Sequence, residues 1–228
     1  MIFEHYLLTR VNIGLYDRKQ KVRGGQKIEP QSWMEHRLDL FEKYCAPSVN
    51  NQRCQNFTWF IVLDPKTPME HRMRIENAVQ VKHKVLFGDN FRKAVKKEIP
   101  IQEIVITSRM DCDDAIHMDF IKDIQEWYEK KKKTGVVTFP KGWTYNIKKE
   151  NLCHFRYPKN PFLTLIEKAD KKVRTILFHR HTEAIKFYKL HKVETGHRWC
   201  MVVHDQNLSN RMWGDSVPVS SLSQGEWW

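Results

Sequence analysis

Three aspartates lie within four residues of the sequence, at Asp111-Cys112-Asp113-Asp114, directly after the apolar run 104–107. A short apolar run of this kind is typical of a buried strand. In extended backbone Asp111 and Asp113 project to the same side, and two neighbouring carboxylates repel each other unless a cation lies between them. Carboxylate oxygens favour Mg²⁺ or Mn²⁺, which also bind substrate phosphates. The cluster therefore predicts a divalent-metal site with Asp111 and Asp113 as ligands.

The same triplet also fits an acidic turn, in which Asp114 or Asp119 only begins the next helix. Two further features favour the metal site. Arg109 lies at the same strand end and is suited to pairing with a phosphate or to holding an aspartate. His204 follows another apolar run, 199–203, and can supply a nitrogen ligand to the same cation.

Two more predicted strands end in polar residues. The first, 2–8, is followed by Thr9, Arg10 and Asn12, and the second, 57–63, by Asp64. Ligands of open α/β sheets bind beyond the carboxyl ends of the strands, so we expect these four side chains to line the substrate site. Arg10 suits a phosphate or a carboxylate partner, and Asp64 suits a base N–H or a sugar hydroxyl.

Strand and helix patterns alternate through the first two-thirds of the chain. Ser32 and Glu35 form a capping-box pattern before a helix that Pro47 is expected to end. Further helices are predicted over 69–79, 90–98 and 119–132, and further strands over 84–87 and 136–139. This order predicts an α/β fold, a doubly wound, mixed and mostly parallel sheet with helices on both faces.

The pattern is looser after residue 140. Strands are predicted over 143–146, 153–157, 174–178 and 199–203, and helices over 161–168 and 182–190. With no repeat and no linker, a single domain over 1–215 is expected, with a substrate-binding half over 1–140, an acceptor-side half over 141–215 and a tail over 216–228. The sequence does not decide whether that tail is docked.

Composition narrows the class of protein. No apolar stretch approaches the ~20 residues that span a bilayer, and no signal peptide is recognisable, so a cytoplasmic location is expected. Five scattered cysteines without a CxxC pair argue against a zinc cage or a disulfide framework. The net charge of +12 is compatible with nucleic acid, an anionic membrane or a phosphorylated substrate, and does not choose among them.

The ordered set of segments resembles the bacterial family of putative rhamnosyltransferases, glycosyltransferase-like proteins with a GT-A fold and a DxD motif. The likeness spans about residues 3–207 and is carried by residues 3–12, 33–37, 40–48, Gln52, 56–64, 107–115, 119–121, 160–162 and 203–204. The many lysines and the segment 205–210 depart from the family pattern.

The resemblance implies a nucleotide-sugar donor bound against the sheet, with a cation bridging its diphosphate. By carry-over, Asp111 lies near the ribose or sugar, Asp113 is the main metal ligand and His204 is the C-terminal histidine ligand. The family's description names rhamnose as the sugar, and the acceptor is expected to be a glycan or lipid-linked hydroxyl. The basic charge adds the expectation of peripheral contact with an anionic membrane.

An inverting transferase needs a general base to deprotonate the acceptor hydroxyl. The acceptor-side half offers Glu167, His179, His181 and Glu183, of which His181 is our catalytic candidate. Two other functions remain open: a nucleic-acid-binding protein or metal-dependent nuclease, and a non-catalytic module that binds sugar nucleotides. No nucleic-acid recognition motif is present, so no nucleic-acid partner is expected.

Overall fold

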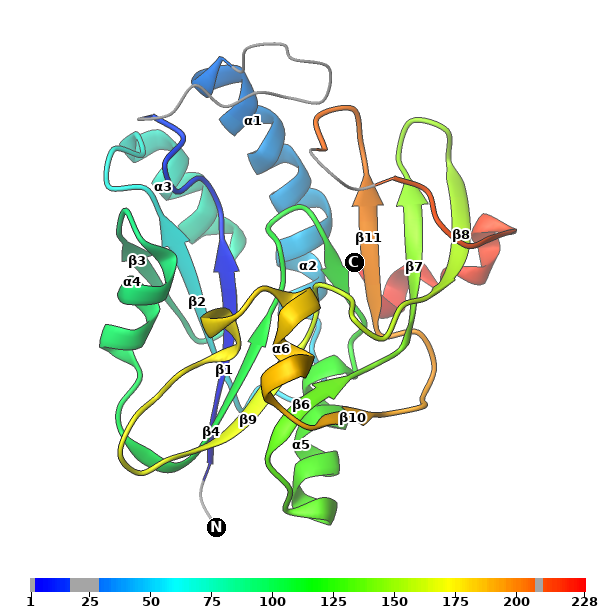
Figure 1. Ribbon diagram of the computed structural model, residues 1–228. Helices are drawn as coiled ribbons and strands as arrows, with labels where there is room; N and C mark the ends of the chain where they lie inside the picture. Colours follow the sequence, from blue (N-terminus) through cyan, green and yellow to red (C-terminus); the bar gives the residue numbers. More distant parts are fainter. Residues whose placement is uncertain (1–2, 17–28, 208–210) are drawn as a thin grey trace.

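The computed structural model describes residues 3–16, 29–207 and 211–228 (Figure 1). Its larger sheet has seven strands in the order β10-β6-β9-β4-β1-β2-β3. Their bounds are β1 (Phe3–Arg10), β2 (Thr58–Leu63), β3 (His83–Phe87), β4 (Gln102–Arg109), β6 (Gly135–Thr138), β9 (Thr164–Ala169) and β10 (Leu190–Lys192). The pairs β1–β2, β1–β4, β2–β3 and β6–β10 are parallel, and β9 pairs antiparallel with β4 and β6. The sheet is mixed and mostly parallel, as predicted.

Alternate strand residues face two separate cores. Leu7 and Ile61 pack with α1 (Pro30–Leu40), α3 (Met69–Ala78) and α5 (Phe120–Lys131), whereas Leu8 and Val62 pack with α4 (Phe91–Glu98) and α6 (His181–Phe187). Successive side chains of a strand point to opposite faces, so the fully apolar β2 needs cover on both. The predicted helices on both faces are confirmed.

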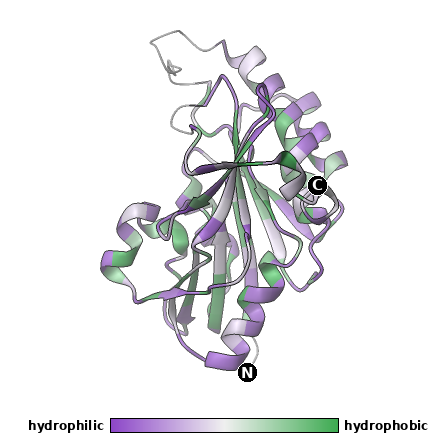
Figure 2. Cartoon of the chain, turned by 90° about the vertical axis from the view of Figure 1, so that its right-hand side faces the viewer, coloured by the Kyte–Doolittle hydropathy of each residue, from purple (hydrophilic) through white to green (hydrophobic). Residues whose placement is uncertain are grey.

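A second sheet has five strands in the order β12-β8-β7-β11-β5. These are β5 (Ala115–Ile116), β7 (Lys141–Asn146), β8 (Asn151–Arg156), β11 (Trp199–Val203) and β12 (Asp215–Val217). Figure 1 shows β7, β8 and β11 beside the first sheet, and Figure 2 shows helices with hydrophilic and hydrophobic sides. The described residues contain no helix that is long and apolar enough to cross a membrane.

The tail is docked. Trp227 is 2% exposed and packs with Ala115, Trp143 and Leu222, and the amide of Met118 donates to the carbonyl of Glu226 at 2.9 Å. Two short 3-10 helices, Val219–Ser221 and Gln224–Glu226, precede the final tryptophans. The chain end therefore supports the segment that follows the aspartate cluster.

Two local predictions were wrong. Residues 161–168, expected as a helix, contain β9, and 174–178, expected as a strand, contain the 3-10 helix Ile176–Phe178. β9 fills the gap between β4 and β6, so strand pairing across the sheet overrides the local helical pattern. Of the two aspartates that could begin the next helix, Asp119 stands at the N-cap of α5 and Asp114 precedes β5. Ile2, at the start of the first predicted strand, lies outside the described residues.

The first helix also differs from expectation at both ends. Its N-cap is Glu29, whose carboxylate accepts from the amides of Gln31 and Ser32, so Ser32 is not the cap. Pro47 does not end the helix either, because the π-helical turn Phe41–Cys45 is followed by α2 (Ala46–Asn50). Pro47 falls in the first turn of α2, directly after the π-helical turn, and the amide of the residue before it, Ala46, donates to the carbonyl of Phe41.

Gly142 in β7 tests the packing between the two sheets. A Cβ there would lie 2.1 Å from the ring of Trp199, which is fully buried, stacks on Phe162 and donates to the carbonyl of Phe139. That ring cannot move aside, so we expect Gly142→Ala to lower the free energy of unfolding by about 1–3 kcal/mol in urea denaturation. Gly225→Ala, with no atom within 4 Å of the new Cβ, is the control. Equal stabilities would contradict this packing.

Candidate active site

The predicted site residues gather where β1, β4 and β11 end, beside α1 (Figure 1). β4 ends at Arg109, and Asp111, Cys112, Asp113 and Asp114 form the turn before β5; the amide of Asp114 donates to the carbonyl of Asp111 at 3.3 Å. β1 and β4 are parallel neighbours, so their carboxyl ends meet at the same edge of the sheet. This arrangement agrees with the position expected for a ligand.

Asp113 lies at the centre of a buried polar cluster. Its side chain is 6% exposed and forms an ion pair with Arg37 of α1. The same oxygen, Oδ2, lies 3.0 Å from Nε2 of His204 and 3.3 Å from Nδ2 of Asn207. Asn207 is fixed in turn, because its Oδ1 accepts from the amide of His204 at 2.7 Å. One carboxylate thus joins α1, the turn after β4 and the end of β11.

Two neighbouring carboxyls of the cluster titrate differently. Burial raises the pKa of Asp113, but the charge of Arg37 and the hydrogen bond from His204 outweigh it and bring the pKa down to about 2. Burial and the charges of Asp113 and Asp111 hold the pKa of Asp114 well above its usual 3.8. Asp114 Oδ1 accepts from the amide of Val202 at 2.9 Å and Oδ2 has no partner. Asp113 is therefore the ionised carboxyl, and Asp114 positions β11.

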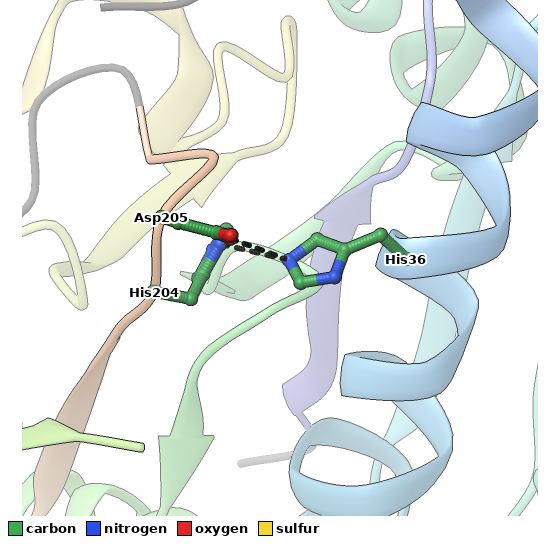
Figure 3. Close-up of side chains that lie close together, drawn as sticks. All are labelled: His36, His204 and Asp205. Carbon is green, nitrogen blue, oxygen red and sulfur yellow. Dashed lines mark hydrogen bonds and ion pairs between the residues drawn. The ribbon is translucent and has the colours of Figure 1, made fainter. Parts of the chain in front are cut away.

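His204 faces a second group with its other ring nitrogen. Nδ1 lies 3.0 Å from Nε2 of His36, and that Nε2 lies 3.8 Å from Oδ1 of Asp205 (Figure 3). One ligand atom from each of His36, His204 and Asp205 lies within 4.8 Å of the others, a spacing that could hold a metal ion. The ring of His204 is therefore positioned between Asp113, which lies at Nε2, and His36, which lies at Nδ1.

Asp111 occupies a more open place than Asp113. Its side chain is 33% exposed, and its Oδ1 lies 3.4 Å from Nη2 of Arg109 and 3.9 Å from Nε of Arg10. Arg10 is 60% exposed in its side chain and Arg109 is 16% exposed. Two guanidinium groups and one carboxylate therefore lie together at the edge of the sheet, and their net charge is positive.

His181, the first residue of α6, adjoins this group. Its Nδ1 lies 2.7 Å from the carbonyl oxygen of Lys159, and because a carbonyl only accepts, Nδ1 carries the proton. The unprotonated Nε2 is then free to act as a base. Burial, together with the charge of Arg109, lowers the pKa of His181, which keeps the ring neutral at pH 7.

Thr9, Asn12 and Asp64 are buried and serve the scaffold. Thr9 Oγ1 accepts from the indole of Trp59 at 3.0 Å, and Asn12 Oδ1 accepts from the amide of Asp64 at 3.0 Å. Asp64 uses Oδ2 for the amide of Gly14 and Oδ1 for that of Lys66. These bonds hold the turn after β1 against the end of β2. The contacts with substrate expected of Thr9, Asn12 and Asp64 stay predictions.

The predicted metal ligands are only partly brought together. A separation of 3.0 Å between Asp113 Oδ2 and His204 Nε2 is what two ligands about 2.1 Å from one cation would show. Within the described chain neither Asp111 nor Asp113 belongs to a group of three such donors; the one such group is His36, His204 and Asp205. Arg37 also contacts Asp113 Oδ2, so a cation there has to share that carboxylate with a guanidinium. The fold therefore brings Asp113 and His204 together and leaves Asp111 apart from them, and their roles as metal ligands stay predictions.

Three members of the cluster, Arg37, His36 and Asn207, were not singled out as site residues from the sequence. Arg37 and His36 stand in the middle of a helix, and nothing local distinguishes them from a solvated helix face. Asn207 follows His204 by three residues, a spacing that suits a turn in which its amide caps the strand end. Only the packing of α1 against β11 could reveal the first two.

The family model described as "Putative rhamnosyl transferase" matches residues 25–216 of this chain. The chain belongs to this family. The match covers most of the 228 residues, including Arg37, Asp113, His181 and His204. No curated protein matches the chain.

Two crystal structures of TarS 1–349 from S. aureus are similar to this rhamnosyl transferase family member. One has a TM-score of 0.49 at 13% identity and covers 87% of this chain and 60% of TarS 1–349. The other, a complex with UDP-GlcNAc, has a TM-score of 0.47 at 12% identity and covers 90% and 60%. This chain thus spans about three-fifths of the TarS chains, and the assignment depends on the family match and not on them.

Replacing Arg37 tests the buried ion pair. Arg37→Met leaves the Asp113 carboxylate buried without its counter-charge, and we expect unfolding free energy to fall by about 3–5 kcal/mol at pH 7. Asp113 has a lowered pKa, so the pair contributes fully above the unfolded pKa of 3.8 and is lost as pH falls through about 2. The difference in unfolding free energy between Arg37→Met and wild type, measured by urea denaturation, should therefore become smaller as the pH falls from 3.8 to about 2.

The matched control is Arg53→Met. Arg53 also pairs with an aspartate, Asp119, at 3.0 Å, but its side chain is 52% exposed. We expect a change of about 0–1 kcal/mol there. If both variants lost the same small amount at pH 7, the Arg37–Asp113 pair would not be the constraint described above.

Proposed function

We propose that the protein transfers a sugar from a nucleoside-diphosphate sugar to a hydroxyl acceptor. The observation that carries this proposal is the pairing of two guanidinium groups, Arg10 and Arg109, with Asp111 and the neutral His181 at one sheet edge. The family membership supplies the reaction class. The family's description names rhamnose, and we propose a nucleotide-linked rhamnose as one donor.

The two arginines suit the donor's diphosphate. Arg10 is exposed and Arg109 is held beside Asp111, so each can turn a guanidinium towards phosphate oxygens at the sheet edge. Positive charge placed in advance near the leaving diphosphate stabilises the transition state, in which negative charge builds up there. Asp111 keeps both guanidiniums in place and offers oxygens to ribose or sugar hydroxyls.

We propose that a divalent cation, Mn²⁺ or Mg²⁺, is held by Asp113 and His204. When bound, it neutralises charge on the departing diphosphate as a Lewis acid. Asp113 suits this role because its low pKa keeps it ionised, and Asn207 keeps the backbone of His204 in place. The group of His36, His204 and Asp205 is the competing location for the same ion.

His181 is the proposed general base. Nδ1–H donates to the carbonyl of Lys159, which fixes the ring orientation and leaves Nε2 to take the proton of the acceptor hydroxyl. The other candidates are engaged elsewhere or open to solvent. Glu167 accepts from the amides of Arg174 and Thr175, His179 stacks on Phe187, and Glu183 is exposed.

Donor binding and its dependence on a cation form one experiment. We expect the melting temperature of metal-stripped protein to rise with one of a panel of UDP-, GDP- and dTDP-sugars, and to rise further with Mn²⁺. The Mn²⁺ increment should vanish in His204→Ala and Asp113→Asn. It should remain in Asp205→Ala, because Asp205 belongs only to the competing location.

The outcomes separate the alternatives. Loss of the Mn²⁺ increment in Asp205→Ala would show that the ion is held by His36, His204 and Asp205 and not by Asp113 and His204. Stabilisation by an oligonucleotide and by no sugar nucleotide would replace the proposed function with nucleic-acid binding or cleavage. Donor binding without sugar transfer or hydrolysis would leave a binding module.

The role of His181 predicts a loss of turnover. We expect His181→Asn to lower kcat for transfer by about 10²–10⁴-fold while the donor KM changes little. Because the pKa of His181 is lowered, the wild-type rate should fall on the acid side only below pH 6.5, and this limb should disappear in the variant. His191→Asn, which loses a similar ring-to-carbonyl bond at Thr134, is the control. Wild-type turnover in His181→Asn would exclude this base.

A further inference from the structure

A basic and aromatic surface covers residues 170–192, which run from the end of β9 through α6 to β10. Seven basic side chains stand here against two acidic ones, Asp170 and Glu183, so this stretch carries +5 of the chain's net charge of +12. All seven are exposed: Lys171, Lys172, Arg174, Arg180, Lys186, Lys189 and Lys192. Elsewhere in the described chain several arginines are paired with carboxylates, as Arg74 is with Glu42, but none of these seven has a carboxylate within 4.0 Å.

Two large apolar side chains stand among these charges. Phe178 is 47% exposed and Phe187 is 62% exposed. The ring of His179 lies between them, stacked on Phe187 at a centroid distance of 3.8 Å and edge-on to Phe178 at 4.7 Å. α6 is fastened to the core by Ala184, its one buried residue. The three rings therefore form a raised aromatic group on a small element, and not part of the core.

We propose that this surface, the 170–192 face, docks on an anionic lipid bilayer. Exposed lysines and arginines are attracted to acidic headgroups, and exposed phenylalanines gain by entering the boundary between headgroups and acyl chains. Both features are present in this one stretch of the chain, and among the described residues none of its seven basic side chains has a carboxylate within 4.0 Å. The partner is a lipid surface, and its chemistry is an acidic headgroup above an apolar layer.

A single-stranded nucleic acid is the other polyanion that combines with basic and aromatic residues. Its bases stack on free aromatic faces that line a groove. Here one face of Phe187 is already covered by His179, and Phe178 meets the same imidazole edge-on. What these rings offer to a partner is apolar edge and one outer face on a short helix. That geometry suits insertion into lipid better than base stacking.

The 170–192 face adjoins the candidate active site. α6 begins at His181, whose ring lies within the electrostatic reach of Arg109 and Asp111, and it ends six residues later at Phe187. At 1.5 Å per residue this is a distance of about 9 Å along the helix. Figure 1 shows α6 lying in front of the strand ends. Docking would bring the proposed base close to the bilayer. This position favours a lipid-linked acceptor, an inference that rests on the proposed function.

Vesicle binding tests the inference directly. We expect the full chain to co-sediment with vesicles that mix phosphatidylcholine with phosphatidylglycerol, and not with phosphatidylcholine alone. Phe178→Ser combined with Phe187→Ser should weaken this binding at least about tenfold, because the apolar contribution is lost. Lys186→Glu combined with Lys189→Glu should weaken it similarly, and raising the salt concentration should have the same effect.

The matched control is Met69→Ser combined with Met73→Ser on α3. These side chains are 66% and 56% exposed and lie outside the 170–192 face, so vesicle binding should not change. Equal binding by the Phe178/Phe187 variant and wild type would overturn the proposal. So would an absence of preference for phosphatidylglycerol, or tight binding to an oligonucleotide that the same substitutions abolish.

The failure of this inference differs from the failure of the proposed function. The melting-temperature response to the donor panel is measured on the same variants, and Phe178 and Phe187 have no place in the donor site. Vesicle binding without any donor response would refute only the transferase proposal. A donor response without vesicle binding would refute only the docking proposal.

Discussion

A buried carboxylate must have its charge compensated, and the region around the candidate site is organised by this need at Asp113. Arg37 and His204 meet at its Oδ2, and Asn207 adds a third donor. Unpaired, a charge in this position would cost several kcal/mol. The packing of α1 over the sheet and of β11 beside the turn after β4 therefore depends on these partners meeting at Asp113.

This constraint also separates two kinds of polar residue at the sheet edge. Asp113, Asp114, Thr9, Asn12 and Asp64 are buried and hold turns and strand ends in position. Arg10, Asp111 and His181 are more open and lie near one another at the same sheet edge. The rigid group makes the open group precise, because a side chain is positioned accurately only when the backbone beneath it is fixed.

The two sheets position different parts of the candidate site. The seven-stranded sheet brings the ends of β1 and β4 together, and the smaller sheet delivers His204 at the end of β11. The docked tail completes this second sheet, with Trp227 against Ala115 and Trp143. β11 pairs with β5, the strand that directly follows the aspartate turn, so the position of His204 relative to Asp113 is set by strand register.

The sequence by itself determined the mostly parallel sheet with helices on both faces and nearly all strands before residue 140. Period and apolar runs are local signals, and two-sided burial of β2 enforces them. It also identified Asp113 and His204 as polar groups at strand ends, which the tertiary structure places 3.0 Å apart. The order of residues Asp111 to Asp114 gave no basis for assigning one as ionised and another as neutral.

Only the tertiary structure decided what depends on contacts between distant residues. β9 is a strand because β4 and β6 lie on either side of it, and the helical chain passes Pro47 through the π-helical turn Phe41–Cys45 and α2. Arg37, 76 residues before Asp113, became part of the site through packing alone. The physical reason is the same in each case: strand pairing and charge compensation in the interior outweigh local preference, and neither leaves a periodic trace in the sequence.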